Sequence, residues 1–542
     1  MNPVAFQRRD ALDQMASQPF DVLVIGGGIT GAGVALDAAS RGLSTALVER
    51  DDFASGTSSK SSKLIHGGLR YLQQREFRMV YEGLAERQLA LRNAAHLVRV
   101  LPFLIPVLTR DGLINPKVAR ALGTAMWMYD LTGGARIGKL HRRIDRERAF
   151  AHMPTMPRDK LAFAYLYYDA HADDARLTLT IARTAAAHGA VIANRARVVG
   201  LRKDAPGRVR GATIEADGER IDVAARVVVN ATGVWSDDIR TLDEGTRPSS
   251  IRPAKGIHIT VPWEKVRNDI AVIVPVPKDR RSIFVVPWGD FTYIGTTDTD
   301  YSGPIDDPPV TSEDVRYLLD AVNLAVTEPI TEADIVGTWA GLRPLVAGGS
   351  VGEKTADLSR HHRVQPAVSG MITITGGKLT TYRRMASDTV DAVMSQLGRR
   401  GRCQTKRLRL LGAEGPAPAD AHLAGRYGSL SANVLALAHA DATLDEPLVP
   451  GLPYRKAEAV YAVRHEMATT LDDVLSRRTR ARLLGRDAAA AAAADVARLI
   501  APDLGWSDAQ IAEQVSSYRA AAAAERDAAQ LPEVALDATL GT

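Results

Sequence analysis

The apolar and polar positions of residues 20–50 follow the order of a βαβ unit. Asp21 to Ile25 is apolar after its first residue and predicts a buried strand, and a second apolar strand ends at Glu49. Between them lies a helical segment that opens with Gly26-x-Gly28-x-x-Gly31 and that Gly42 closes. In such a turn the first glycine permits the tight bend, the second admits a pyrophosphate, and the third lets helix and strand pack closely. We therefore predict a bound adenine dinucleotide.

The dinucleotide is expected to contact both ends of this unit. Ile29 and Thr30 open the helix, where unpaired backbone amides favour phosphate. Glu49 lies at the tip of the second strand and is placed to accept hydrogen bonds from ribose hydroxyls, with Arg50 directly after it. A 2′-phosphate at this position would meet a like charge.

The rest of the apolar pattern predicts a second sheet and a helical tail. Residues 250–345 are rich in Val, Ile, Pro and Thr and predict an antiparallel sheet that forms the floor of a substrate cavity. Helical spacing predicts a helix from Gln74 to His96, and an alanine-rich composition predicts helices from about residue 410 onward. Residues 110–150 are basic and are interpreted as irregular. The expected strands are 191–201, 208–215, 221–230, 256–261, 271–276, 282–287, 291–296 and 371–375.

Composition narrows the classes of function. At 542 residues the chain is too long for one hydrophobic core and suggests about three domains, and 46% apolar with 24% charged residues is ordinary for a globular protein. The net charge of +5 and pI near 9.2 favour anionic substrates or membrane headgroups. Nucleic acid is disfavoured, because no dense basic tract is interleaved with aromatic residues.

The single cysteine, Cys403, excludes an intrachain disulfide and a cysteine-built metal cluster. The first 21 residues lack the apolar core of a signal peptide, and no apolar run reaches 18 residues. We therefore expect a cytoplasmic protein with no membrane-spanning segment and no metal site.

Three glycine- and hydroxyl-rich elements far apart in the sequence favour FAD over an exchangeable nicotinamide dinucleotide. An extended flavin dinucleotide needs a further wall, which the Ser55 to Lys63 loop and the Gly376-Gly377 turn would supply. A helix N-terminus at that turn would stabilise negative charge on reduced flavin. The serine-rich loop also has a plainer interpretation as a flexible polar segment. Beyond the βαβ unit, the expected cofactor contacts are Ser55, Thr57, Ser58, Lys63, Leu64, His66, Gly67, Gly68, Ala231, Thr232, Gly233, Gly376, Gly377, Lys378, Leu379 and Thr380.

Longer motifs extend from residue 20 to about residue 385. They are DVLVIGGGITGAGVALDA, SSKSSKLIHGGLRYL, NATGVW, KGIHI, GTTDTDY, GLRPL, SR at residues 359–360, and GGKLTTYR. Together they resemble the FAD-dependent glycerol-3-phosphate dehydrogenases of the bacterial aerobic type. The tail resembles the C-terminal cap of that family in RHEMATTLDDVLSRRTR, residues 464–480.

The resemblance implies an α/β fold in three parts. These are an FAD-binding Rossmann-like domain of the glutathione-reductase and D-amino-acid-oxidase type, an antiparallel-sheet substrate domain and a C-terminal α-helical cap. The expected boundaries are 1–68, 156–250 and 341–400 for the FAD domain, 69–155 and 251–340 for the substrate domain, and 401–542 for the cap.

The resemblance also implies that the chain oxidises sn-glycerol 3-phosphate to dihydroxyacetone phosphate by hydride transfer to N5 of FAD. Such a site needs an anion clamp, and guanidinium groups bind phosphate oxygens in a bidentate manner. By resemblance, Arg343 and Arg360 are the expected clamp, with Arg70 and Tyr71 nearby in function. Arginines in such numbers mostly form surface pairs, so a purely structural role is the alternative for Arg360.

The site also needs a base for the hydroxyl proton. His258 is our first choice, because an imidazole with an ordinary pKa is largely neutral at pH 7 and can accept a proton. A histidine that only packs in the core is the alternative. Lys378 would polarise the substrate oxygen or steady the flavin. Lys255, His66 and Thr375 are candidates of second rank.

The electron acceptor is left open by the residues themselves. No CxxC pair, haem motif or iron–sulfur spacing supplies an onward carrier, and the resemblance implies membrane quinone. A glycerol-3-phosphate oxidase that forms hydrogen peroxide and a non-catalytic FAD-binding sensor are the alternatives. The basic segment from Arg110 to Arg148 is as compatible with peripheral contact to the inner face of the cell membrane as with a solvated surface. A homodimer is compatible with the sequence, and no calcium-loop pattern occurs.

Overall fold

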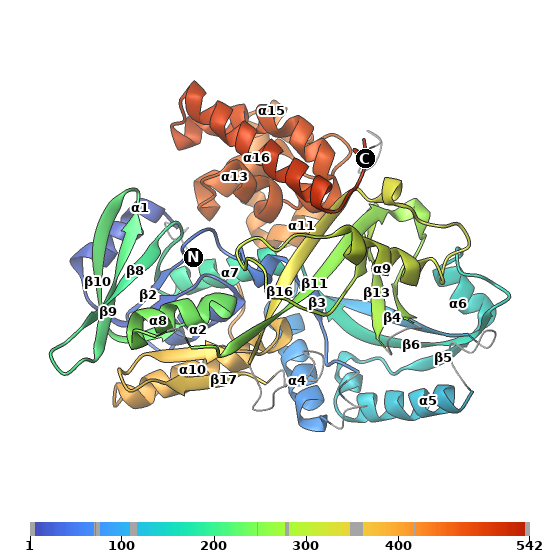
Figure 1. Cartoon of the computed structure of the whole chain (residues 1–542), viewed down its shortest axis with the longest axis horizontal. Helices are drawn as coiled ribbons and strands as arrows, with labels where there is room; N and C mark the ends of the chain where they lie inside the picture. Colours follow the sequence, from blue (N-terminus) through green and yellow to red (C-terminus); the bar gives the residue numbers. More distant parts are fainter. Residues whose placement is uncertain are drawn as a thin grey trace.

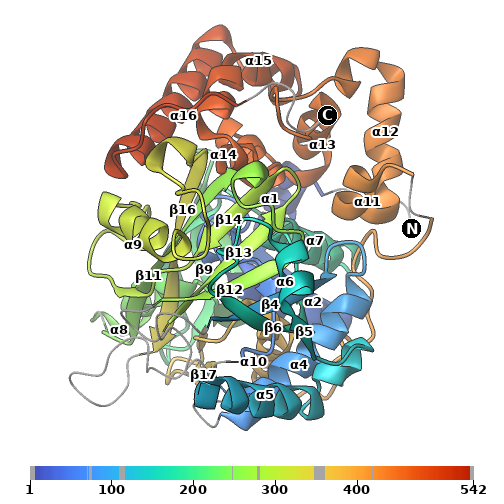
Figure 2. The ribbon, with the colours of Figure 1, turned by 90° about the vertical axis from the view of Figure 1, so that its right-hand side faces the viewer.

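Two β-sheets and a C-terminal group of helices build the chain (Figure 1). The computed structural model describes residues 6–69, 71, 76–108, 116–246, 248–276, 281–346, 361–416 and 419–536. The C-terminal helices lie above the sheets in Figures 1 and 2, and helix α5 (Pro116–Leu131) lies at the opposite end of the molecule.

The first sheet contains the predicted βαβ unit. Its central strands are parallel, and the apolar residues of β1 alternate between two cores: Val22 and Val24 pack with helix α2, while Leu23 and Ile25 pack beneath an antiparallel meander. Helix α2 (Ile29–Ser40) contacts both α7 (Asp174–Ala187) and α10 (Tyr382–Gln396), and all three contribute to the first core. The sheet order is β17 (Arg363–Pro366), β18 (Ile372–Thr375), β10 (Glu219–Asn230), β1 (Phe20–Ile25), β2 (Thr45–Val48) and β7 (Val191–Ala193), and β8 (Arg197–Lys203) and β9 (Val209–Ala216) complete the meander with β10.

The second sheet is mostly antiparallel, as its alternating Val and Ile positions predict. Strand β16 (Gly337–Val346) pairs with β11 along ten residues, which opposes Trp339 to His258 and Arg343 to Ala254. Strand β5 (Arg142–Asp145) pairs with β6 at the other side. The sheet order is β15 (Thr299–Asp300), β11 (Ile251–Pro262), β14 (Phe291–Gly295), β13 (Ser282–Trp288), β12 (Ala271–Pro275), β4 (Arg99–Leu108), β6 (Leu161–His171) and β3 (Leu64–Ile65).

Helices complete the fold. The alanine run at residues 488–494 lies in a long helix, as predicted from helix propensity, and helps to form the core of the C-terminal group. No helix of the described residues is long and apolar enough to cross a bilayer. The other helices are α1 (Arg8–Ser17), α4 (Phe77–Asn93), α6 (Arg146–His152), α8 (Ser236–Glu244), α9 (Ser312–Val322), α11 (Ala421–Tyr427), α12 (Ser431–Ala440), α13 (Lys456–Glu466), α14 (Ala481–Leu484), α15 (Arg486–Leu504) and α16 (Asp508–Ala528), and residues Asp473–Arg478 form a short π-helix.

The structure differs from the sequence expectations in three places. Residues 110–150 are not irregular where described, because α5, β5 and α6 occupy most of residues 116–150. The expected strand 191–201 is two strands that belong to different parts of the first sheet, with Arg195 between them at a φ of 50°. Strands β3 and β6 pair within the second sheet, although the expected boundaries assign both to the FAD domain.

Candidate active site

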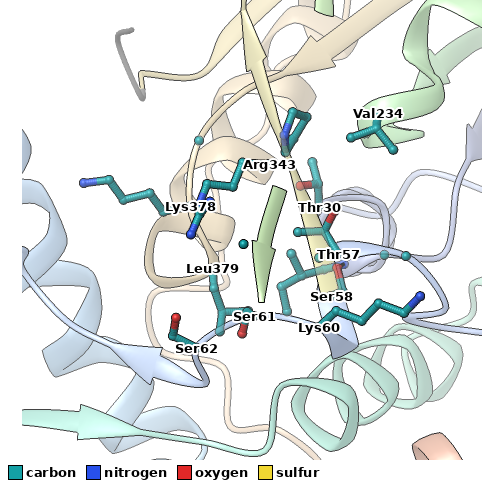
Figure 3. A pocket seen from close by; sticks show the side chains of 18 of the residues that line it. Thr30, Thr57, Ser58, Lys60, Ser61, Ser62, Val234, Arg343, Lys378 and Leu379 are labelled. Atoms are coloured by element: carbon teal, nitrogen blue, oxygen red, sulfur yellow. Dashed lines mark hydrogen bonds between the residues drawn. The ribbon is translucent and has the colours of Figure 1, made fainter. Parts of the chain in front are cut away.

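One large cavity, about 1270 Å³ in volume, is lined by residues of both sheets. Its volume exceeds the range of about 300–1000 Å³ that is usual for small-ligand pockets, so it has room for a long cofactor and a small substrate together. The predicted site residues that line it are Gly26, Gly28, Ile29, Thr30, Glu49, Arg50, Ser55, Thr57, Ser58, Leu64, His66, Gly68, Tyr71, Ala231, Thr232, Gly233, His258, Arg343, Gly376, Gly377, Lys378, Leu379 and Thr380. Several of these side chains are shown in Figure 3.

The glycine-rich turn has the geometry that a dinucleotide requires. Gly26 has a φ of 111°, and a Cβ atom on Gly31 would lie 1.8 Å from the carbonyl oxygen of Gly26. Gly31 therefore lies behind the turn, outside the cavity lining, where it allows the predicted close packing. The Ser58 hydroxyl accepts a hydrogen bond from the Ile29 amide at 2.9 Å, which holds the serine-rich loop against the start of α2.

Glu49 is held by the same turn. Its two carboxylate oxygens accept hydrogen bonds from the amides of Gly27, at 2.6 Å, and Asp51, at 2.9 Å. Burial raises the pKa of Glu49. Each carboxylate oxygen has a second lone pair that remains for a ribose hydroxyl. A glycine cradle, a helix N-terminus and a carboxylate in this order fit the adenosine and pyrophosphate of FAD, and these residues would hold them.

His258 lies on β11 with its ring buried against Trp339. The two rings are stacked at a centroid distance of 4.6 Å, and Nε2 of His258 lies 2.9 Å from the Ser62 hydroxyl. Burial, with the nearby cations Lys63 and Arg343, lowers the pKa of His258 well below its ordinary value of 6.5. The imidazole is therefore neutral at physiological pH, as a proton acceptor must be.

Arg343 extends into the cavity from β16 (Figure 3). Its guanidinium donates to the Asp298 carboxylate at 3.1 Å and to the Thr297 carbonyl at 3.2 Å. These contacts fix the plane of the guanidinium before any ligand arrives. A fixed and partly exposed guanidinium suits an anionic ligand.

Lys378 follows the glycine pair Gly376-Gly377, whose φ angles of 74° and 82° favour glycine. Its ammonium lies 3.6 Å from the centre of the Tyr71 ring, and in Figure 3 it points away from Thr57 and Ser58. A Cβ atom on Gly377 would meet the sulfur of Met385 at 2.3 Å, so the turn packs directly on α10. The predicted helix after the glycine pair is present.

Besides Gly31, four described residues of the predicted site lie outside the cavity lining. The ammonium of Lys63 turns away from the cavity to bind Asp174 at 2.9 Å. The ammonium of Lys255 binds Asp314 at 2.6 Å, so this side chain does not face the site. Gly67 packs behind the loop, where its amide donates to the Tyr129 hydroxyl, and Thr375 is buried. Arg70 and Arg360 lie outside the described residues.

Sequence reasoning missed several residues that the fold brings into the site. Ser62 and Trp339 both contact His258, Ser62 through its hydroxyl and Trp339 by ring stacking. Arg281 lines the cavity and donates to the Asp298 carbonyl at 2.7 Å. Ser62 lies inside the SSKSSK motif of residues 58–63, so this motif could have indicated it as a site residue. Trp339 lies in β16, whose partner β11 is distant in sequence, and Arg281 directly precedes β13. No local pattern marks either residue.

Comparisons with known proteins agree with this geometry. The family model of FAD dependent oxidoreductases matches residues 21–383, and that of the C-terminal domain of alpha-glycerophosphate oxidase matches residues 403–511. Glycerol-3-phosphate dehydrogenase 2 of Mycobacterium tuberculosis is 42% identical over 541 residues, covering 96% of this chain and 91% of the relative. The chain belongs to the FAD-dependent glycerol-3-phosphate dehydrogenase family. Glycerol-3-phosphate dehydrogenase of Mycobacterium leprae is also 42% identical over 541 residues.

A solved member of the glycerol-3-phosphate dehydrogenase family shares the whole architecture. The enzyme of Bacillus halodurans, solved in complex with FAD, is 29% identical, has a TM-score of 0.76 and covers 98% of both chains. The predicted family, the three-part fold and FAD as the cofactor are thereby confirmed. The individual site residues stay predictions, supported by their positions in one cavity.

Proposed function

We propose that this chain oxidises sn-glycerol 3-phosphate to dihydroxyacetone phosphate at FAD and passes the electrons to a membrane quinone. The observation that supports it best is convergence within one cavity. The dinucleotide turn, the neutral His258, the oriented Arg343 and the Lys378 ammonium come from four distant parts of the sequence and line a single space. An FAD enzyme for a small phosphorylated alcohol needs this combination of an anion site and a base.

Each group has a distinct task in this proposal. The guanidinium of Arg343 binds phosphate oxygens, and Asp298 keeps it oriented. His258 takes the hydroxyl proton at Nε2, the nitrogen that faces the Ser62 hydroxyl. Lys378 favours negative charge on the substrate oxygen. When bound, FAD supplies the acceptor for the C2 hydride.

The part of the cavity lining that α5 contributes favours an apolar electron acceptor. Leu122 and Ala125 of α5 line the cavity, whereas Trp127 and Leu131 on the outer side of the same helix are 55% and 82% exposed. A helix that lies on a membrane turns aromatic and aliphatic side chains toward the lipid, and Trp127 and Leu131 lie one helical turn apart. We propose that α5 makes peripheral contact with the membrane, from which quinone reaches the site.

The electron acceptor distinguishes the proposed dehydrogenase from a second candidate function, an oxidase that reduces oxygen. The match of the C-terminal region to a domain named for an alpha-glycerophosphate oxidase favours testing oxygen. The test supplies the FAD-loaded protein with glycerol 3-phosphate and either a soluble quinone analogue or oxygen alone, with glycerol as the control substrate. We expect rapid quinone reduction and little hydrogen peroxide. Peroxide formed in a one-to-one ratio with product at the quinone-supported rate would replace the quinone assignment by the oxidase.

A further inference from the structure

The cavity loop of residues 58–63 is held from behind by buried charges. The Ser59 carbonyl accepts hydrogen bonds from the ammonium of Lys63, at 3.1 Å, and from the guanidinium of Arg480, at 2.8 Å. Arg480 lies just after the π-helix of the C-terminal group, more than 400 residues along the chain from this loop. A distant part of the chain therefore contacts the backbone of a loop that lines the site.

Asp174, at the start of α7, joins these groups. One of its carboxylate oxygens accepts from Lys63 at 2.9 Å and from Arg480 at 2.5 Å. The other accepts from the amide of Ser61 at 3.0 Å and from its hydroxyl at 2.7 Å. Lys63, Asp174 and Arg480 are all buried. Burial and the neighbouring Arg480 lower the pKa of Lys63 to about 8, since Asp174 offsets only part of their effect.

The opposite side of the same loop touches the proposed base. The Ser62 hydroxyl lies 2.9 Å from Nε2 of His258, and the Ser62 carbonyl accepts from the Tyr293 hydroxyl at 2.9 Å. Trp339, which stacks on His258, donates from its indole to the Ser61 carbonyl at 3.2 Å. Two consecutive residues thus connect the buried charges on one side of the loop to His258 on the other.

We propose that Arg480 is a positioning residue for this site: through Asp174 and the loop of residues 58–63, it fixes the Ser62 hydroxyl against His258. This inference rests on the proposed function, in which His258 takes the substrate proton. It also assigns a role to the region matched by the C-terminal domain of alpha-glycerophosphate oxidase. That region supplies Arg480, whose guanidinium binds the Ser59 carbonyl and the Asp174 carboxylate behind the loop. Misplacement of a proton acceptor slows the chemical step more than it weakens substrate binding.

A purely structural role is the competing explanation, because buried ion pairs also hold domains together. Arg183 provides a matched control. It is on the same helix as Asp174 and pairs with Glu466 of α13 at 2.9 Å, across the same contact between α7 and the C-terminal helices. Arg183→Met removes a guanidinium from this interface and leaves Asp174, Arg480 and the loop intact.

The test compares Arg480→Met, Arg480→Lys, Ser62→Ala, the double variant Arg480→Met with Ser62→Ala, and Arg183→Met, each loaded with FAD. The rate of flavin reduction by glycerol 3-phosphate is measured under anaerobic conditions in a single turnover. Amide hydrogen exchange of residues 58–63 is measured by mass spectrometry without substrate. Arg480→Lys keeps a cation at the position and carries the test if Arg480→Met does not fold.

We expect Arg480→Met to lower the reduction rate about tenfold or more, with Arg480→Lys intermediate and Arg183→Met within about twofold of the unsubstituted chain. Exchange of residues 58–63 rises in Arg480→Met and not in Arg183→Met. In the double variant, the loss is close to that of Ser62→Ala alone, because both changes remove the same contact. Multiplying losses, or unchanged exchange in the loop, would overturn the inference. If the unsubstituted holoenzyme is not reduced at all, the proposed function fails instead.

Discussion

Replacing Arg343 by alanine removes the guanidinium that we assign to the substrate phosphate. The side chain is 22% exposed and is oriented by Asp298, at 3.1 Å, and by the Thr297 carbonyl, at 3.2 Å. A hydrogen bond to a charged group contributes about 1.5–3 kcal/mol, and each 1.4 kcal/mol corresponds to a factor of about ten. We therefore expect kcat/KM for glycerol 3-phosphate to fall by about 10- to 150-fold in Arg343→Ala. Arg343→Lys should recover part of this loss, because it keeps the charge without the bidentate geometry.

The assay is steady-state turnover with an artificial electron acceptor, together with the ratio of FAD to protein from the absorption spectrum. Arg240→Ala is the matched control, because Arg240 is 23% exposed and pairs with Glu244 on helix α8. The control should keep the kcat/KM of the unsubstituted chain, and both variants should keep their flavin. The preference for glycerol 3-phosphate over glycerol should shrink only in Arg343→Ala. An Arg343→Ala variant with unchanged kcat/KM and unchanged preference would refute the assignment of the phosphate site.

Four further changes test other parts of the site and fold. His258→Asn should lower turnover by about 100-fold or more and leave FAD bound. In the unsubstituted chain, the acid limb of the pH–rate profile should lie below pH 6.5, because burial and nearby cations lower the pKa of His258. Lys63→Met removes one of those cations, so the pKa of His258 should rise and the acid limb should move to higher pH, whereas an unmoved limb contradicts the assignment of the base. Gly31→Ala places a Cβ atom 1.8 Å from a carbonyl oxygen and should give a protein without flavin, whereas Gly200→Ala, which meets open space, should stay yellow. Burial opposes ionisation of Asp52, but two arginines of the C-terminal group hold its pKa below its ordinary value of 3.8. The ionised Asp52 therefore adds to the free energy of unfolding above pH 3.8, and this contribution is lost as the pH falls through the lower pKa of the folded state. Asp52→Asn should lower the free energy of unfolding, measured with urea, by about 3 kcal/mol at pH 7 and by much less in strong acid.

The parts of the fold that the sequence predicted are those written in continuous local patterns. The βαβ unit and strands β11 to β14 of the second sheet follow from apolar runs bounded by glycine and proline, and most of their ends lie within a few residues of the structure. Strands β4, β6 and β16 of the same sheet were not among the expected strands. Helix α5 was missed although Leu122, Ala125, Met126 and Tyr129 recur at helical spacing. The arginines and glycines around these positions interrupt the apolar pattern and obscure this period.

The candidate site divides in the same way. Residues in motifs, such as Arg343 and Lys378, were found because the motifs resemble those of a known family. The contact of Ser62 with His258 joins residues 196 positions apart, and the pair of Asp174 with Arg480 joins residues 306 positions apart. Lys63 and Lys255 show the converse, since buried partners far along the chain take their ammonium groups out of the site. Such contacts depend on the tertiary fold, and no local period or composition encodes them.

In the proposed function, this cavity brings bound FAD and glycerol 3-phosphate together for oxidation. Glycerol 3-phosphate is added to the purified flavoprotein without oxygen, and the flavin band at about 450 nm is recorded. We expect the band to bleach and one dihydroxyacetone phosphate to form for each flavin, whereas glycerol should leave the spectrum unchanged. A band that persists at saturating glycerol 3-phosphate would rule out this function.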